Sequence, residues 1–170
     1  MNREILFRGK RVDNKEWIYG YLVKSEDYIF DYSERIDIPY IIPFDNFNLK
    51  DYREYRVDEN TIGQYTGLTD KNGVEIYEGD ILETYENYGM GECWLKYEVK
   101  YNKELAQFIL FPVIENGKYN SNNWDTPIYS YHEQAREVIG NIFDEKEWLN
   151  ERTYFKTFKN IWIYYNMASN

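Results

Sequence analysis

Apolar and polar residues alternate over the first part of the chain in a pattern typical of paired strands. One such run spans residues 4–7, a second spans Trp17 to Val23, and Asp13-Asn14 between them tolerate the left-handed backbone of tight turns. We therefore predict an N-terminal β-hairpin. Farther along, Pro39 and Pro43 bracket a short apolar run, which indicates an edge strand or an irregular crossing because proline cannot donate to a sheet ladder.

The segment from Gly63 to Leu82, GQYTGLTDKNGVEIYEGDIL, is the part of the chain richest in turn signals. Its Asn-Gly pair predicts a tight hairpin, and its Glu-Gly-Asp break before an apolar strand suits a sharp bend at the corner of a small barrel. We interpret the segment as scaffold. Its predicted structural turn residues are Gly63, Gly67, Asn72, Gly73, Gly79 and Asp80.

Later apolar runs predict three more strands, over residues 94–101, 107–114 and 138–142. Asp144 then has the features of a helix N-cap, with Glu147 three positions on as its capping-box partner. We predict a C-terminal helix from this point. Beyond Thr153 the pattern fits a helix or a strand.

Composition favours a folded, mainly β protein of one domain. The chain has 170 residues, of which 19% are aromatic, and it includes 19 tyrosines. The mean hydropathy of -0.77 is low because each tyrosine adds a polar hydroxyl to a ring that still packs well. Disordered chains are poor in aromatic residues, so disorder is excluded, and tyrosine-rich chains favour sheet.

The charge and the lone cysteine restrict the setting in which the protein acts. A formal net charge of -10 works against non-specific binding to nucleic acids and anionic membranes. No uncharged apolar run approaches the length of a membrane span, and Cys93 has no second cysteine for an internal disulfide. These features predict a cytoplasmic protein that does not bind a membrane.

Few residues fit known catalytic chemistry. The chain has one histidine and one cysteine, too few for a structural zinc site, and no serine lies in a Gly-x-Ser-x-Gly elbow. We therefore expect no catalytic residues, no metal and no cofactor. A metal-assisted enzyme using the clustered carboxylates Asp70, Glu78 and Asp80 stays open as an alternative, since paired carboxylates can hold a divalent cation.

Nucleic-acid binding by a small barrel is the other alternative. Such barrels stack bases on aromatic side chains and neutralise phosphates with a few basic residues. The competing interpretation of the basic cluster is the solvated end of a hairpin. The candidate binding residues are Arg3, Arg8, Lys10 and Arg11 for the basic patch and Tyr65 and Tyr77 for stacking.

The segment from Gly63 to Leu82 resembles the hallmark of the YopX family of phage and prophage proteins. The likeness extends to REILFRGKRVDNKEWIYGYLV at the N-terminus, VDENTIGQYTG before the hallmark and EVIGNIFDEKEWL near the end. The resemblance implies a β-rich fold with a small SH3-like barrel and a phage or prophage origin. It implies neither an assigned activity nor catalytic residues.

Together these observations predict a single β-rich domain over residues 1–150, with a barrel core at roughly 61–143, additional hairpins, and an extension over 151–170. The best-supported function is a non-enzymatic protein-interaction module in the cytoplasm of a bacterial host. Its expected partner is a host or phage protein, with a homo-oligomer as a further possibility. Nucleic acid is the less favoured partner.

Overall fold

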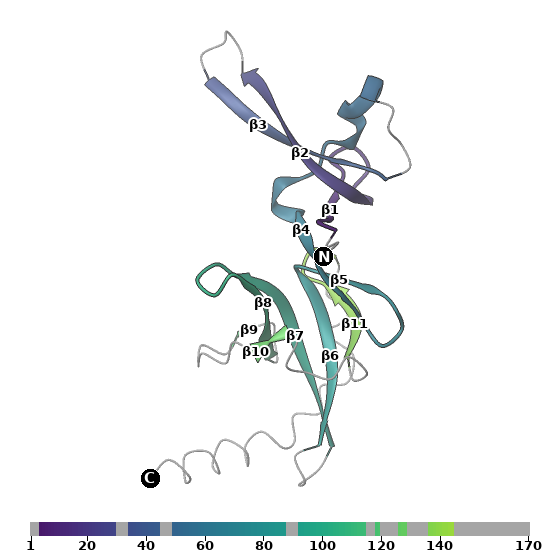
Figure 1. Ribbon diagram of the computed structural model, residues 1–170, viewed down its shortest axis with the longest axis vertical. Helices are drawn as coiled ribbons and strands as arrows, with labels where there is room; N and C mark the ends of the chain where they lie inside the picture. Colours follow the sequence, from purple (N-terminus) through teal and green to yellow (C-terminus); the bar gives the residue numbers. More distant parts are fainter. Residues whose placement is uncertain are drawn as a thin grey trace. The chain divides into compact units, whose positions relative to one another are not determined.

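The computed structural model describes residues 4–29, 34–44, 49–87, 92–114, 118–119, 126–128 and 136–144 (Figure 1). Within these residues the protein is mainly β, as predicted, with two antiparallel sheets and two short 3-10 helices. The chain divides into two compact units. Unit 1 comprises Met1–Leu68 and Glu75–Glu78, and unit 2 comprises Thr69–Val74 and Gly79–Asn170. The described part of the chain has no helix long and apolar enough to cross a membrane.

Unit 1 is built on a five-stranded sheet with the order β3-β2-β1-β4-β5. The strands are β1 Phe7–Lys10, β2 Trp17–Ile29, β3 Glu34–Ile42, β4 Gly63–Thr69 and β5 Glu75–Tyr77. The predicted N-terminal hairpin is present as β1 and β2, and β1 also pairs with β4 on its other side. The proline-bracketed run belongs to β3, which is an edge strand as predicted.

One small apolar core covers the Ile18 face of this sheet, and a second, formed by Ile38, Tyr40 and Ile42 of β3, lies on the opposite face. Ile18, Ile41 and Val57 are buried together, and half-buried side chains such as Leu22 and Ile62 pack against them. Two 3-10 helices, η1 Leu49–Tyr55 and η2 Glu59–Thr61, occupy the connection between β3 and β4. This core fixes which face of β2 points inward.

Unit 2 is built on a second sheet with the order β10-β8-β7-β6-β11, and β9 also pairs with β8. The strands are β6 Asp80–Asn87, β7 Glu92–Asn102, β8 Gln107–Ile114, β9 Lys118–Tyr119, β10 Thr126–Pro127 and β11 Arg136–Asn141. The three strands predicted after the turn-rich segment correspond to β7, β8 and β11. Leu82, Val99 and Leu110 are fully buried in this unit.

The predicted SH3-like barrel is wrong for the described residues, because their strands form two open sheets. The N-terminal strand β1 lies between β2 and β4, so β4 and β5 extend the N-terminal hairpin. Strand β6 instead pairs with β7 and β11 in the other sheet. The range 61–143, predicted as one barrel core, is thus divided between two sheets. The predicted C-terminal helix lies outside the described residues.

Candidate functional site

The face of the unit 1 sheet opposite the Ile18 core carries most of the binding residues predicted from the sequence. Opposing residues of antiparallel strands point to the same face, and β1 and β2 pair Arg8 with Tyr19 and Lys10 with Trp17. Side chains alternate along a strand, so Tyr21 shares this face with Tyr19. The face therefore combines two basic residues with a row of aromatic rings.

Arg8 is built into this face rather than displayed on it. Its side chain is buried, with 6% of the residue exposed. The guanidinium carbon lies 4.7 Å from the centre of the Trp17 ring and 5.1 Å from that of Tyr77. Its Nη2 also donates to the backbone carbonyl of Glu78 at 3.4 Å. Cation–π contact with two rings stabilises a buried guanidinium, so we assign Arg8 a structural role.

Lys10 lies on the same face and is half-buried. Its Nζ is 5.4 Å from the centre of the Trp17 ring, so this ring contacts two cationic side chains. The backbone N–H of Lys10 donates to Thr61 Oγ1 at 2.8 Å, which ties β1 to η2. Lys10 is therefore more accessible than Arg8, although its position is also held by the fold.

The two tyrosines predicted as a stacking surface do contact each other. The ring centres of Tyr65 and Tyr77 are 5.4 Å apart, and Tyr77 is buried with 2% exposed. The Tyr77 hydroxyl donates to Glu75 Oε2 at 2.6 Å. Burial, together with this carboxylate, raises the pKa of Tyr77 far above its usual range, and burial also raises the pKa of Tyr65. Both phenols are neutral at physiological pH, and Tyr77 is not available for stacking on a base.

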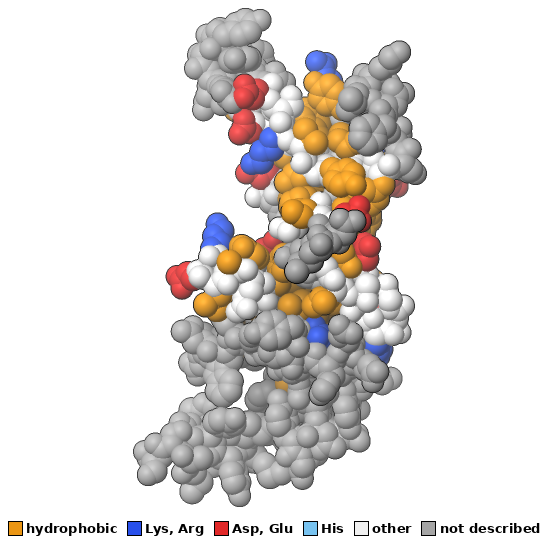
Figure 2. All heavy atoms as spheres, viewed as in Figure 1, with side chains coloured by type: hydrophobic (Ala, Val, Ile, Leu, Met, Phe, Trp, Pro, Cys, Tyr) orange, Lys and Arg blue, Asp and Glu red, His pale blue; other side chains and the backbone are white. Residues whose placement is uncertain are grey.

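The accessible part of the face is a strip along β2 that the sequence analysis did not identify. Tyr19 and Tyr21 are each 42% exposed, Val23 is 45% exposed and Phe44 is 46% exposed. The Tyr21 and Phe44 rings meet edge to face with centres 5.4 Å apart. We call these four residues the β2 strip. Figure 2 shows hydrophobic side chains exposed on one face of unit 1.

The signal for this strip was present in the sequence. Every second residue from Trp17 to Val23 is aromatic or β-branched, while Ile18, Gly20 and Leu22 between them belong to the opposite face. Alternation alone does not say how much of each apolar face is covered, and Tyr40 and Ile42, which lie opposite the strip on β3, are buried in the second cluster. The segment that covers the Ile18 face includes Val57, about forty residues away in the sequence.

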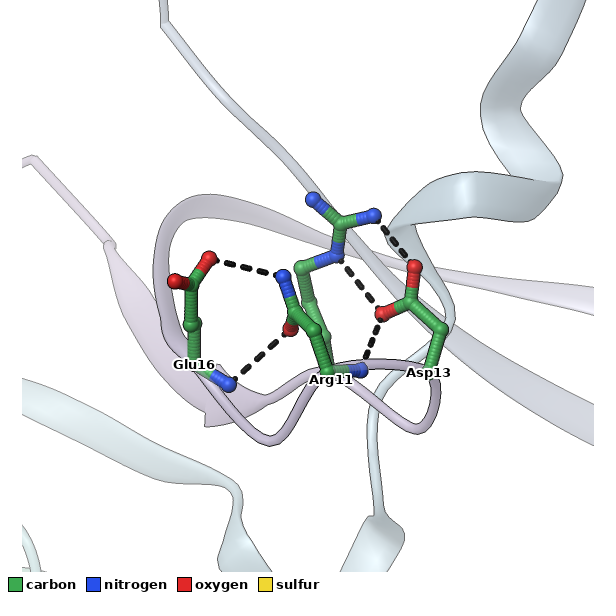
Figure 3. A network of polar contacts seen from close by, with 4 residues as sticks. Arg11, Asp13 and Glu16 are labelled. Carbon is green, nitrogen blue, oxygen red and sulfur yellow. Dashed lines mark hydrogen bonds and ion pairs between the residues drawn. The ribbon is translucent and has the colours of Figure 1, made fainter.

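Arg11 of the predicted patch does not join this face. Arg11 lies at the β1–β2 turn, where Nε donates to Asp13 Oδ1 at 3.0 Å and Nη2 contacts Oδ2 at 2.6 Å (Figure 3). Asn14 and Glu16 complete the network, since Asn14 Nδ2 donates to Glu16 Oε2 at 2.7 Å. Arg11 therefore fits the competing interpretation of the basic cluster, in which it forms the solvated end of a hairpin. Arg3 lies outside the described residues.

Glycines of the turn-rich segment are required by close approaches of the backbone. A Cβ atom on Gly63 would lie 2.4 Å from the carbonyl oxygen of Glu78, the same oxygen that accepts from Arg8. The Glu78 N–H donates to the Gln64 carbonyl at 2.9 Å, which holds the two segments at this separation. Gly63 therefore leaves room for the contact between β4 and the end of β5.

The remaining glycines of the motif provide backbone conformations that other residues adopt only with strain. Gly67, Gly73 and Gly79 have φ values of 85°, 81° and 84°. Space surrounds the first two, whereas a Cβ atom on Gly79 would lie 2.8 Å from Cε2 of Phe143. The structural role predicted for these glycines therefore has a direct geometric basis.

Asp70 fastens the β4–β5 turn to the edge of the unit 2 sheet. Its Oδ1 accepts from the backbone N–H groups of Asn72 at 2.7 Å and Val74 at 2.9 Å, and its Oδ2 accepts from Val138 N–H at 3.0 Å. Burial by itself raises the pKa of Asp70, but these backbone hydrogen bonds outweigh it and hold the pKa below its usual value. Beside it, Lys71 Nζ and Glu137 Oε2 form an ion pair at 2.6 Å.

The carboxylates considered for metal chemistry have separate structural environments. Both oxygens of Asp70 are occupied by backbone donors, and Asp80 is buried at the start of β6 with 1% exposed. Glu78 contributes its backbone carbonyl to the contact with Arg8. Across the part of the chain that the structure describes, no three His, Cys, Asp or Glu side chains form a group that could hold a metal ion. The geometry thus gives no support to the metal-assisted alternative.

Comparisons with known proteins identify the family. The family model described as YopX protein matches residues 6–150. A search of curated proteins found no match. Among solved structures, the chain is similar to the crystal structure of protein EF1440 from Enterococcus faecalis, with 24% sequence identity and a TM-score of 0.41 over 87% of this chain and 99% of the other. The family match covers both described sheets and the whole turn-rich segment, and the chain therefore belongs to the YopX family.

Proposed function

We propose that this chain is a non-enzymatic protein-interaction module that contacts its partner through the β2 strip. The observation that carries the proposal is the exposure of three large aromatic rings and a valine on one side of unit 1. Clustered exposed apolar side chains on a folded domain mark interaction sites, and aromatic residues are enriched in such interfaces.

The side chains behind the strip support this role because they hold it in place. Tyr19 contacts the buried Tyr77 ring with centres 5.5 Å apart, and Tyr77 in turn contacts Arg8. Tyr21 is held at its hydroxyl by Glu4 Oε1 at 3.2 Å. Rings that are fixed before binding lose little conformational entropy in a complex, which favours affinity.

Origin and setting are part of the same proposal. We place the protein in a phage or prophage and in the bacterial cytoplasm, where its partner is a host or phage protein. The net charge of -10 and the single cysteine agree with this setting. A second copy of the chain is the alternative occupant of the strip, and light scattering distinguishes it by mass.

The test is affinity capture from host cells with a matched pair of variants. Val23→Ser removes an apolar side chain from the strip, whereas Val12→Ser removes one of similar exposure, 41%, from the β1–β2 turn. We expect a reproducible partner with the native chain and with Val12→Ser, and its loss with Val23→Ser at unchanged folding. Equal capture by both variants would contradict the proposed surface.

Single-stranded nucleic acid is the second candidate because Lys10, Trp17, Tyr19 and Tyr21 share the exposed face. Stacking on such rings with a few cations is a known mode of binding. Fluorescence anisotropy with a labelled oligothymidine at low salt tests it. Binding that Tyr21→Ser weakens would favour this candidate, and an absence of binding would remove it.

A further inference from the structure

The β2 strip is bordered by carboxylates that contact tyrosine hydroxyls. Tyr21 donates to Glu4 at 3.2 Å, and Tyr77, whose ring lies 5.5 Å from that of Tyr19, donates to Glu75 at 2.6 Å. Glu4 and Glu75 are both exposed. The strip therefore has negative charge at its border, next to the hydroxyl ends of tyrosine rings.

Where Glu4 and Glu75 border the rings, this combination favours a cationic ligand group over an anionic or neutral one. Lys10, the half-buried cation of the same face, contacts Trp17. The face of an aromatic ring attracts cations, and guanidinium groups pair with carboxylates through two parallel hydrogen bonds. The protein already uses such contacts beneath the strip, where Arg8 lies over Trp17 and Tyr77. A guanidinium on the partner would find the same chemistry at the surface.

We propose that the β2 strip binds an arginine-bearing, otherwise apolar segment of the partner protein. In this arrangement guanidinium groups lie against Tyr19 and Tyr21 near Glu4 and Glu75, while apolar side chains contact Val23 and Phe44. The net charge of -10 adds a long-range attraction for such a segment and disfavours acidic ones. This inference rests on the proposed function and specifies the chemistry of its partner.

The experiment uses three acetylated and amidated peptides, Ala-Arg-Leu-Arg-Leu-Ala and its counterparts with glutamine or glutamate in place of arginine. Each is titrated into the full-length 15N-labelled chain and followed by amide chemical shifts at low salt. We expect the arginine peptide to shift the amides of residues 19, 21 and 23, and the glutamate peptide to leave them unchanged. Raising the salt concentration should weaken the binding of the arginine peptide, because salt screens exposed charges.

Matched variants separate the charge from the rings. We expect Glu4→Gln to weaken the affinity for the arginine peptide about two- to fivefold, which corresponds to the loss of one exposed ion pair. Tyr21→Leu keeps apolar area but removes the ring, and we expect a similar loss. Glu104→Gln removes an exposed carboxylate from the β7–β8 turn and should have no effect on the amide shifts.

The outcomes distinguish this inference from the function on which it rests. If the glutamine peptide binds the strip as tightly as the arginine peptide, or if Glu4→Gln and Tyr21→Leu bind as well as the native chain, the arginine preference is wrong while the docking surface stands. If no peptide binds, the arginine preference is likewise overturned. The docking surface itself fails only if Val23→Ser also captures every partner that the native chain captures.

Discussion

A substitution at Gly79 tests whether the turn-rich segment acts as scaffold through its backbone geometry. Gly79 has a φ of 84°, and its N–H donates to the Val99 carbonyl at 2.9 Å. Its own carbonyl accepts from Ile142 at 2.9 Å. The residue thus joins β7 to the chain after β11, so the strain of an added side chain cannot be relieved by a free turn.

The expected cost has two parts. A left-handed conformation costs a residue with a Cβ atom about 1–2 kcal/mol relative to glycine. The new Cβ atom of Gly79→Ala would also lie 2.8 Å from Phe143 Cε2, which forces the ring to move, and such overpacking costs about 1–3 kcal/mol. We therefore expect Gly79→Ala to lower the free energy of unfolding by about 2–5 kcal/mol.

Gly73→Ala is the matched control, since φ is 81° and no atom lies within 4 Å of the added Cβ position. It should show the backbone cost alone, about 1–2 kcal/mol. Urea denaturation followed by tryptophan fluorescence measures both. In a double-mutant cycle, Phe143→Ala should restore the unfolding free energy that Gly79→Ala loses through crowding against the ring. The same substitution should restore none of the loss caused by Gly73→Ala. Equal destabilisation by the two alanines, or no recovery in the cycle, would refute the reasoning.

Three further predictions concern other contacts of the motif. Gly63→Ala should destabilise unit 1 without any contribution from φ, because its Cβ atom would lie 2.4 Å from the Glu78 oxygen, and the loss should appear as a lower urea midpoint. Asp70→Ala should cost about 1–3 kcal/mol, since it removes the acceptor of three partly buried backbone N–H groups. The lowered pKa of Asp70 makes the stability depend on pH. The ionised carboxylate stabilises the fold above the unfolded pKa of about 3.9, and this stabilisation is lost as the pH falls through the folded pKa. Asp70→Asn should remove this part of the acid unfolding profile. Arg8→Lys should lower the free energy of unfolding by about 1 kcal/mol, because an ammonium group replaces a guanidinium that contacts two rings. Arg11→Lys, in the exposed turn, is the control and should change the free energy of unfolding by less than about 0.5 kcal/mol in thermal denaturation.

Local features of the fold could be predicted from the sequence because they depend on neighbouring residues. The β1–β2 hairpin follows from the alternation on either side of Asp13-Asn14, although the left-handed residue of its turn is Lys15, with a φ of 64°, and neither of those two. The tight turn at Gly73 follows from the Asn-Gly pair. The sharp bend at Gly79 was also predicted, together with the strand that follows it. In each case a few adjacent residues determine the backbone.

Long-range pairing could not be predicted in the same way. The placement of β1 between β2 and β4 depends on the pairing of Phe7 with Gln64, and no local pattern specifies which distant strand joins an exposed edge. The predicted barrel was wrong for this reason. The partners of Asp70 include Val138, which is close to it only after the sheet has formed.

The candidate site shows the same distinction. The sequence identified Arg8, Lys10, Tyr65 and Tyr77 as residues with the chemistry of a binding surface, and the structure does bring them together on one face. The sequence could not show that Arg8 and Tyr77 are buried, because the exposure of a side chain depends on the strands on either side of it. The exposed members of this face are their neighbours on β2.

The division of the turn-rich segment between the two units has a consequence for how the protein is made. Unit 1 ends at Leu68 and resumes at Glu75–Glu78, while Thr69–Val74 belongs to unit 2, so no single cut in the polypeptide releases either unit whole. During synthesis the first 68 residues cannot complete their sheet until β5 has left the ribosome. A truncated gene product ending before Glu75 would therefore expose the unpaired edge of β4, a template for aggregation.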